Sequence, residues 1–346
     1  MRSYFFLILS CFLMICCQKR EKEVQRWINN QTLSPQFFII SPIKDTTLTG
    51  KQGTRISIKA NSFELDSEVV TKQVKFQLNE FYSVADFVNH RLSTKTTDGR
   101  LLKSSGMIFL QAQIEGKEVK IKENQPLTIH FPRKQDSPTA NLFKGKKGPN
   151  EEIIWTVLPP VHHDTVVVRE IKSTKADARG VVSTRVTLKL KIGNDTIELT
   201  ERFKKDIQNA DAKFASQVVG DTAIEQVEVT TDLYYIFQTS DMGWLNCDIF
   251  IDEALYPFVV QTKQKGADIF VVVDNMNSVM YPNDIKGNEY IFNLPKNSPI
   301  SVVSYLEDEG KYLFGLEKIN SSQGQAEIKE KPMSLEQINY QIKNLK

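Results

Sequence analysis

The sequence is poor in the features that mark several common classes of protein. It has only 4 cysteines and 4 histidines among 346 residues, and its 44 basic residues nearly balance 42 acidic ones. Because a nucleic-acid binder needs a strongly basic surface, this balance argues against nucleic acid as a partner. Hydrophobic residues make up 40% of the chain and charged residues 25%. That composition is typical of a globular protein long enough for two domains.

The apolar run at the N-terminus is too short to remain in a membrane. It covers residues 4–15, follows Arg2 and ends at Cys16 and Cys17. As a helix it would reach only about 18 Å, against roughly 30 Å for the hydrocarbon core of a bilayer. A basic start followed by a brief apolar run is typical of a signal peptide, which is removed during export.

The end of this run resembles the lipobox of bacterial lipoproteins. It stops at cysteine and not at an A-x-A-like site, and the resemblance implies cleavage before a diacylated cysteine. Cleavage before Cys17 leaves the small Cys16 in the last signal position, whereas cleavage before Cys16 would leave the bulky Ile15 there. We therefore predict lipidation at Cys17, with Cys16 as the second choice. An ordinary signal peptide and an uncleaved anchor are the alternatives.

The lipid would anchor the protein without a membrane-spanning helix. Residues 1–16 are then the signal peptide, and residues 17–36 are a lipidated tether of mixed charge. Gln18 and Lys19, followed by acidic residues, also resemble the surface-export signal of lipoproteins in the Bacteroidota. We expect the protein at the outer membrane, on its periplasmic face or at the cell surface. Cys247 is then the only cysteine of the folded part, so no disulfide can stabilise that part.

Much of the remaining chain alternates apolar and polar residues with the period of a half-buried strand. In the first part the alternating sets are Ile56/Ile58, Val74/Phe76/Leu78, Ile108/Leu110/Ala112/Ile114, Val119/Ile121 and Leu127/Ile129/Phe131. Glu115-Gly116 and Asp98-Gly99 are typical of turns between such strands. Ser83 and Ser334 each begin a capping-box pattern, which predicts a short helical turn and a C-terminal amphipathic helix.

We predict an all-β fold of two β-sandwich-like domains, with one inserted helix and a C-terminal amphipathic helix. Composition changes at the Pro-, Gly- and Lys-rich stretch 133–150, which we interpret as a linker. The predicted parts are a sandwich over residues 37–132, this linker, a second β-rich domain over 151–318 with a helix near 201–219, and a tail over 319–346 with the terminal helix.

Three motifs follow one another in the first domain. They are K-Q-G-T-R-I-S-I-K-A-N-S-F at residues 51–63, V-K-F-Q-L-N-E-F-Y at 74–82 and L-L-K-S-S-G-M at 101–107. Their order resembles ZU-type β-sandwich domains, the kind shared by zonula occludens protein, netrin receptors and ankyrins, in the version found in exported bacterial proteins. The resemblance covers roughly residues 38–132 and implies a sandwich there.

The chain also departs from that pattern. Lys59 stands where a proline is usual. Some proteins of this kind cleave themselves after a His-Phe pair that precedes serine, but His130-Phe131 is followed here by Pro132, which has no nucleophile. Residues 242–248, M-G-W-L-N-C-D, resemble the G-W-I-N-C-D element that accompanies the ZU-like part in the same exported proteins. That element locates a domain and implies no activity.

Few residues are candidates for chemistry. His162-His163 could suggest a metal, but no third histidine follows at ligand spacing, and we expect a solvated loop after Pro159-Pro160. Residues 274–278 offer oxygen atoms at alternate positions but lack the glycine and glutamate of an EF-hand, so we expect a polar turn. Cys247 lies in an apolar segment, which favours a small buried residue over a thiol nucleophile. We predict no catalytic residue, metal or cofactor.

The aromatic residues favour packing over display. Trp155 and Trp244 each lie in an apolar strand context, so core packing is favoured over a platform for sugar or peptide. We therefore expect Trp244 and Cys247 to be structural. The function that fits best is a lipid-anchored envelope protein that acts as a non-catalytic binding or scaffold module for a protein or glycan partner. The alternative is a cell-envelope hydrolase with an unrecognised active site.

The anchor can be tested directly. Replacing the acylated thiol in Cys17→Ser should abolish both lipid attachment and membrane retention, because the tether has no apolar surface of its own to insert. Mass spectrometry of the mature N-terminal peptide gives the readout, and Cys11→Ser is the control that should leave the lipid in place. An unmodified cysteine on the mature N-terminus would refute the prediction.

Overall fold

The computed structural model describes residues 35–66, 68–133, 138–159, 162–173, 184–192, 195–198, 233–308 and 310–345. Over these residues the chain forms five β-sheets, two α-helices and a short 3-10 helix, η1 (Ser321–Gln323). The predicted all-β class is confirmed. The predicted signal peptide, nearly all of the tether and the helix expected near 201–219 lie outside the described residues.

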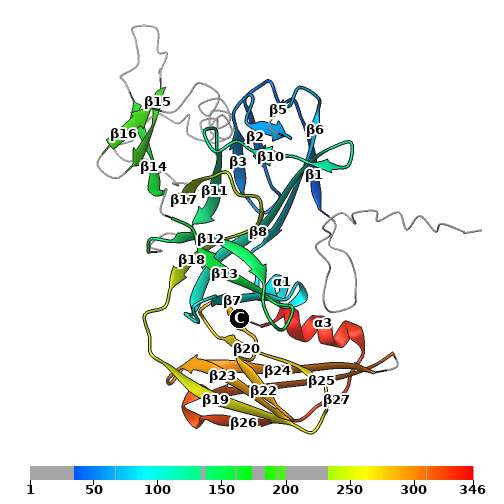
Figure 1. The fold of residues 1–346 in the computed structure, drawn as a ribbon. Coiled ribbons are helices and arrows are strands. Elements are labelled where there is room, and N and C mark those ends of the chain that lie inside the picture. The colour runs from blue at the N-terminus through cyan, green and yellow to red at the C-terminus, as the bar shows by residue number, and fades with distance from the viewer. Residues whose placement is uncertain are drawn as a thin grey trace, which may run out of the picture.

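Two large sheets pack face to face in the first sandwich (Figure 1). The eight-stranded sheet has the order β1 (Gln36–Ile40), β6 (Val74–Phe81), β8 (Leu102–Ile114), β18 (Gly243–Phe250), β12 (Asn141–Lys147), β13 (Ile153–Val157) and β7 (Leu92–Thr96), with β9 (Lys117–Glu118) paired to β8. The seven-stranded sheet has the order β16 (Asp195–Glu198), β15 (Thr184–Ile192), β14 (His162–Ser173), β17 (Leu233–Thr239), β11 (Leu127–Arg133), β3 (Arg55–Ile58) and β2 (Thr46–Thr49).

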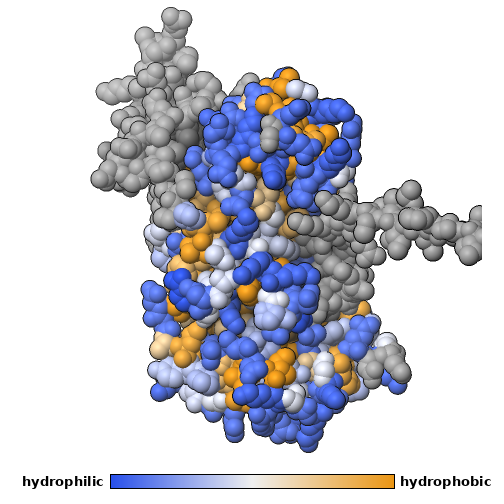
Figure 2. Space-filling model, in the orientation of Figure 1, coloured by the Kyte–Doolittle hydropathy of each residue, from blue (hydrophilic) through white to orange (hydrophobic). Residues whose placement is uncertain are grey.

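A small three-stranded sheet completes the first sandwich, with the order β10 (Lys120–Ile121), β4 (Phe63–Leu65) and β5 (Glu68–Val69). The predicted hairpin turn at Glu115-Gly116 joins β8 to β9, and both residues have positive φ, 51° and 79°. Two consecutive positive φ values are what a tight two-residue hairpin turn requires. Hydrophilic side chains cover most of the face seen in Figure 2, and apolar ones gather at its upper end over β5 and β6.

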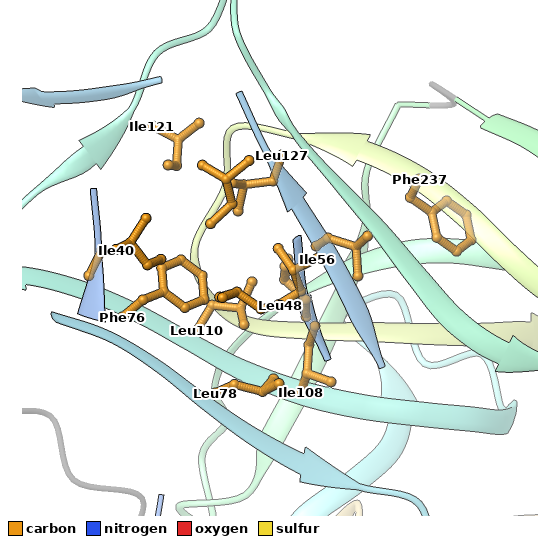
Figure 3. Close-up of a cluster of buried hydrophobic side chains, with 14 of the residues drawn as sticks. Ile40, Leu48, Ile56, Phe76, Leu78, Ile108, Leu110, Ile121, Leu127 and Phe237 are labelled. Carbon is orange, nitrogen blue, oxygen red and sulfur yellow. The ribbon is translucent and has the colours of Figure 1, made fainter. Parts of the chain in front are cut away.

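The first core lies between the two large sheets (Figure 3). It is filled by the alternate residues that the period-two pattern singled out, such as Ile56, Phe76 and Leu110. Each of these side chains is at most 1% exposed. Because neighbouring residues of a strand point to opposite faces, the sequence alternation directly selects the side chains that fill this core.

The second sandwich is smaller and is built from the last third of the chain. Its four-stranded sheet has the order β22 (Asp284–Lys286), β23 (Glu289–Pro295), β19 (Leu255–Thr262) and β26 (Gln325–Ile328). Its five-stranded sheet has the order β21 (Ser278–Met280), β20 (Asp268–Val273), β24 (Pro299–Asp308), β25 (Lys311–Asn320) and β27 (Lys331–Pro332). A second core, which includes Phe258, Phe292 and Val271, lies between them.

Strand β20 is buried on both faces. Ile269, Val271 and Val273 face the core of the second sandwich, whereas Phe270 and Val272 belong to a third apolar cluster on the opposite face. All five side chains are at most 2% exposed. A continuous apolar run is the sequence signature of such a doubly covered strand. The five-stranded sheet therefore contributes to two cores at once.

The third cluster, called the shared core below, joins the two sandwiches. The eight-stranded sheet contributes Phe81, Phe109 and Trp155 to it from the face opposite the first core. Helices α1 (Val84–Asn89) and α3 (Leu335–Lys343) pack against each other and against this cluster, between the sandwiches in Figure 1. Both predicted capping boxes are present, which confirms the two helix starts. The sandwiches are thus held together by a continuous apolar layer.

The predicted division into domains differs from the structure. Residues 133–150 are not a linker, because 141–147 form β12, which pairs with both β13 and β18 in the eight-stranded sheet. The first sandwich therefore extends to Phe250, and the second begins at Leu255. Within the predicted tail, β26 and β27 are strands of the second sandwich.

The sequence of strand β12 contains a glycine and several lysines, a composition that is typical of a linker. A Cβ at Gly145 would lie 2.6 Å from the Trp244 Cβ and 2.7 Å from both Ile153 and Trp155 side-chain atoms, so the close approach of two aromatic rings requires glycine here. Leu142 is buried in the first core and Phe143 in the shared core. Glycine and exposed lysines, which suggested a linker, are here features of an inner strand.

Among the described residues there is no helix with the length and apolar character that a membrane span needs.

Because the two sandwiches share one core, we expect them to unfold together. Leu101 lies in the turn between β7 and β8 of the first sandwich, yet its side chain is fully buried in the core of the second. Leu101→Ala should lower the free energy of unfolding by about 2–5 kcal/mol, because a buried leucine loses its contacts and leaves a cavity. Chemical denaturation should show a single transition that shifts as a whole.

The control for this variant is Ile285→Ala in β22, where the side chain is 46% exposed and the change should be small. A second sandwich that unfolds in a separate, earlier transition would contradict the coupling.

Candidate functional site

The histidine pair lies in a strand and not in the predicted loop. His162 and His163 begin β14, where they stand opposite Phe237 and Ile236 of β17. The predicted loop is wrong, because residues 162 and 163 pair with β17, a strand that is distant in the sequence. Within the described ranges, no group of three or more His, Cys, Asp and Glu side chains is arranged to hold a metal ion.

The segment 274–278 is the polar turn that the sequence predicts, joining β20 to β21. Asp274 accepts a hydrogen bond from the Ser301 hydroxyl at 3.1 Å, and the Asn277 amide donates to the Ser104 carbonyl at 3.1 Å. The Ser278 hydroxyl lies 2.6 Å from the Thr94 hydroxyl. Two of the partners of this turn thus belong to the first sandwich, so the turn joins the two sandwiches by hydrogen bonds.

Cys247, Trp155 and Trp244 pack against the cores. Cys247 has no exposed surface and lies in the first core. Trp155 is fully buried, and its ring nitrogen donates to the Ser93 carbonyl at 2.6 Å. Trp244 is half-buried, with ring centroids 5.1 Å from Phe109 and 5.4 Å from Phe81. These positions fit structural roles for Trp244 and Cys247.

The first two of the three sequence motifs meet around one buried carboxylate. Glu80 is 5% exposed and accepts hydrogen bonds from the backbone N–H groups of Gln52 and Thr54, at 2.9 and 3.0 Å, and from the Gln36 amide at 2.8 Å. A Cβ at Gly50 would lie 2.4 Å from this carboxylate. The first two motifs therefore hold the turn between β2 and β3 against β6.

The third motif fits against the second through a glycine. Tyr82 places its ring where a Cβ at Gly106 would lie, only 2.2 Å from Tyr82 Cε1, and Gly106 has φ of 146°. The Tyr82 hydroxyl is 2.7 Å from the Thr54 hydroxyl, and burial raises the Tyr82 pKa well above its ordinary value. The spacing of the three motifs thus reflects packing and turn geometry.

Asp248 is the one acidic residue of the M-G-W-L-N-C-D segment, and it is fully buried. It has no exposed surface and accepts hydrogen bonds from the Asn246 amide at 2.6 Å and the Ser105 N–H at 3.3 Å. It stands where the register between β8 and β18 shifts, so its carboxyl satisfies a backbone group that the irregularity leaves free. Burial raises the pKa of Asp248 to about 7.

A partly buried ion pair lies at the junction of the sandwiches. Arg91 donates to the Asp268 carboxylate at 3.1 Å and to the Asn150 carbonyl at 2.6 Å, and its guanidinium lies 5.1 Å from the Tyr281 ring centroid. Burial raises the pKa of Asp268, and Arg91 opposes that rise. The Asn150 amide donates to the Pro282 carbonyl at 3.0 Å. The members of this cluster are far apart in the chain, so no local sequence pattern marks it.

One accessible apolar feature lies at an edge of the eight-stranded sheet. Strand β1 pairs with β6 on one side, and no described strand pairs with its other side. Phe37 and Ile39 project from it with 48% and 65% of their surface exposed, and the Lys75 ammonium lies 4.2 Å from the Phe37 ring centroid. We call the free side of β1, with these two side chains, the edge site.

Edge strands are normally protected against pairing with other chains, by charges, proline, bulges or short length. Strand β1, with the sequence Q-F-F-I-I, has five residues, none of them charged and none a proline. Its pairing with β6 runs in register from Gln36 to Ile40 without a bulge. The run of four apolar residues directly after the tether is the sequence signal for this site, although by itself it indicates only the start of the first domain.

Comparison of the chain with family models, with curated proteins and with solved structures finds no match. The candidate site therefore rests on its own geometry.

The buried carboxyl of Asp248 predicts a pH dependence. An exposed aspartate titrates near 3.9, whereas Asp248 titrates near 7, so the folded chain binds more protons between these values and stability falls as pH rises. Relative to Asp248→Asn, the wild type should lose on the order of a few kcal/mol in free energy of unfolding between pH 4 and 7, about 1.4 kcal/mol per pH unit.

The comparison with the variant isolates Asp248 from His130. Burial and Arg55 lower the pKa of His130 to about 4, so this histidine acts in the opposite direction over part of the same interval. His130 is present in both proteins, so its contribution cancels in the difference. Urea denaturation curves whose difference does not change between pH 4 and 7 would contradict the prediction.

Proposed function

We propose that the protein is a lipid-anchored component of the cell envelope, with a ZU-type first sandwich, that acts as a non-catalytic binding or scaffold module for a protein or glycan partner. The observation that carries the proposal is the edge site, an unprotected strand with two exposed apolar side chains. Extended segments of other proteins bind such edges by adding a strand to the sheet. The edge site therefore favours a protein partner over a glycan.

The buried groups support a structural interpretation of the residues that looked chemical. Asp248, Cys247 and Asn246 have no exposed surface, so none of them can touch a partner at the surface. Their hydrogen bonds and packing are directed at the strands of the first sandwich. This arrangement favours a binding module over the alternative, a hydrolase.

The shared core supports the scaffold part of the proposal. A binding strand works best on a rigid support, because less conformational freedom is lost when the partner binds. Here α1, α3 and two sheets pack into one apolar cluster, and Leu101 of the first sandwich is buried in the second. The two sandwiches would thus act together as one rigid support for the binding strand.

The predicted anchor would hold the edge site close to a membrane. Cys17 precedes β1 by fewer than twenty residues, and a chain of that length reaches at most about 65 Å when fully extended. We expect this membrane to be the outer membrane. The edge site lies on the first described strand after the tether and is then the described part of the first sandwich closest to the anchor along the chain.

The proposal is tested by photo-crosslinking in cells that export and lipidate the chain. A photoreactive benzoylphenylalanine replaces Ile39, and in the control it replaces Tyr340, which is 68% exposed on α3. A partner that adds a strand to β1 should give a discrete protein adduct at position 39 and none at position 340. Absence of an adduct at position 39, or equal adducts at both positions, would overturn the proposal.

A further inference from the structure

A buried acid of the first sandwich is connected to the second sandwich through one peptide unit. We propose that the charge of Asp248 sets the strength of the hydrogen bond that Asn277 makes across the junction, so that this contact between the sandwiches responds to pH. The step between the two side chains is the peptide that joins Ser104 to Ser105. This inference goes beyond the proposed function and does not depend on it.

The peptide is available because the pairing of β8 with β18 is irregular. Asp248 stands opposite Ser104, whereas the residue before it stands opposite the glycine two positions further along β8, so Ser105 is the extra residue. An extra residue leaves backbone groups without a partner in the ladder. Here the Ser105 N–H donates to the Asp248 carboxylate at 3.3 Å, and the Ser104 carbonyl of the same peptide accepts from the Asn277 amide at 3.1 Å. The two bonds therefore form a chain that crosses from one sandwich to the other.

Hydrogen bonds in such a chain polarise one another. An ionised carboxylate attracts the Ser105 proton more strongly than a neutral carboxyl does, and bonds to an ionised group are roughly twice as strong as neutral ones. The stronger pull on the N–H raises the negative charge on the Ser104 carbonyl oxygen, which strengthens the next bond by about 10–30%. The Asn277 bond should therefore be stronger when Asp248 is charged than when it is neutral.

The site can also hold the neutral form of Asp248. The Asn246 amide nitrogen donates to Asp248 at 2.6 Å, and the amide oxygen of the same side chain is buried without a hydrogen-bond partner among the described residues. A half-turn of this amide about its Cβ–Cγ bond would present that oxygen to a protonated carboxyl group, which has one O–H to donate. Asn246 can thus pair with either form of Asp248.

Burial, and no neighbouring charge, sets the ionisation of Asp248. Burial raises the pKa of this carboxyl to about 7, and hydrogen bonds from Ser104, Asn246 and the Ser105 N–H oppose the rise. On the two strands that pair with β18, Asp248 stands opposite Ser104 and Asn141, and neither carries a charge. Among the described residues no charged side chain is paired with Asp248.

The charged and titratable side chains on the neighbouring elements have other surroundings. Lys103 of β8 is exposed, Lys144 of β12 is ion-paired, and Asp274 of the turn accepts a hydrogen bond from a serine of its own sandwich. The Tyr82 ring lies against the glycine of β8, and burial keeps the Tyr82 pKa well above its ordinary value, so this hydroxyl stays neutral near pH 7. Asp248 is therefore the group of this cluster whose charge changes there.

The two effects of raising the pH have opposite signs. As pH rises through 7, the buried charge of Asp248 lowers the free energy of unfolding of the whole chain. Over the same interval the Asn277 bond becomes stronger. A stronger contact at the junction therefore cannot be a by-product of the general loss of stability.

The test is NMR of the full chain in detergent, with labelled asparagine side-chain nitrogens and aspartate carboxyl carbons. The Asn277 resonance is identified by its loss in Asn277→Gly, because glycine tolerates the positive φ of 48° at this position. Between about pH 5.5 and 8.5 the bonded Asn277 amide proton should move downfield as pH rises, with the same midpoint as the Asp248 carboxyl carbon. The Asn150 amide, which donates to the Pro282 carbonyl across the same junction at 3.0 Å, is the control and should not follow this midpoint.

In Asp248→Asn the Asn277 resonance should stay in place over the whole interval. An Asn277 proton that does not move while Asp248 titrates would overturn the proposal, and so would a shift that persists in Asp248→Asn. An Asp248 carbon that does not titrate in this interval would overturn it as well. The comparison of Asn277 with Asp248 and Asn150 needs only the wild-type chain, so it decides the matter even where the variant does not fold.

Discussion

The shared core is the constraint on which the rest of the structure depends. It is built from the outer face of one sandwich, the outer face of another and the apolar sides of α1 and α3. None of these faces could stay in water alone, because each presents large apolar side chains such as Phe109 and Phe270. Burying them together turns two sandwiches into one body, and it places α3, the last element of the chain, against α1 of the first sandwich.

Burial also explains the raised pKa values of two acidic side chains. Desolvation raises the pKa of Asp268 at the junction and of Asp248 at the strand irregularity of the first sandwich. Perturbed acids often mark active sites, but structural networks perturb them as well. Here Arg91 and Asn246 donate to these two carboxylates, and among the described residues no group of three or more His, Cys, Asp and Glu side chains gathers to hold a metal ion. The proposed contact with another molecule is instead placed on β1, where Phe37 and Ile39 are exposed.

The sequence predicted what depends on local pattern. Alternation identified the strands of the first core, and the capping boxes at Ser83 and Ser334 identified both helix starts. Local sequence pattern did not predict the features that depend on contacts between distant segments of the chain. Strand β12 reads as a linker because Gly145 is needed for the packing of two tryptophans from other strands, and the Arg91 cluster gathers residues from three regions of the chain. Strand pairing over such separations leaves no short-range signal, so the domain boundary fell about one hundred residues too early.

The claim that the two sandwiches form one body can be tested by native-state hydrogen exchange. If the shared core couples them, the backbone amides of β20 should exchange only through the same global opening as those of β8, with equal free energies and equal dependence on denaturant. Exchange of β20 through a separate opening of lower free energy, while β8 stays protected, would contradict the account.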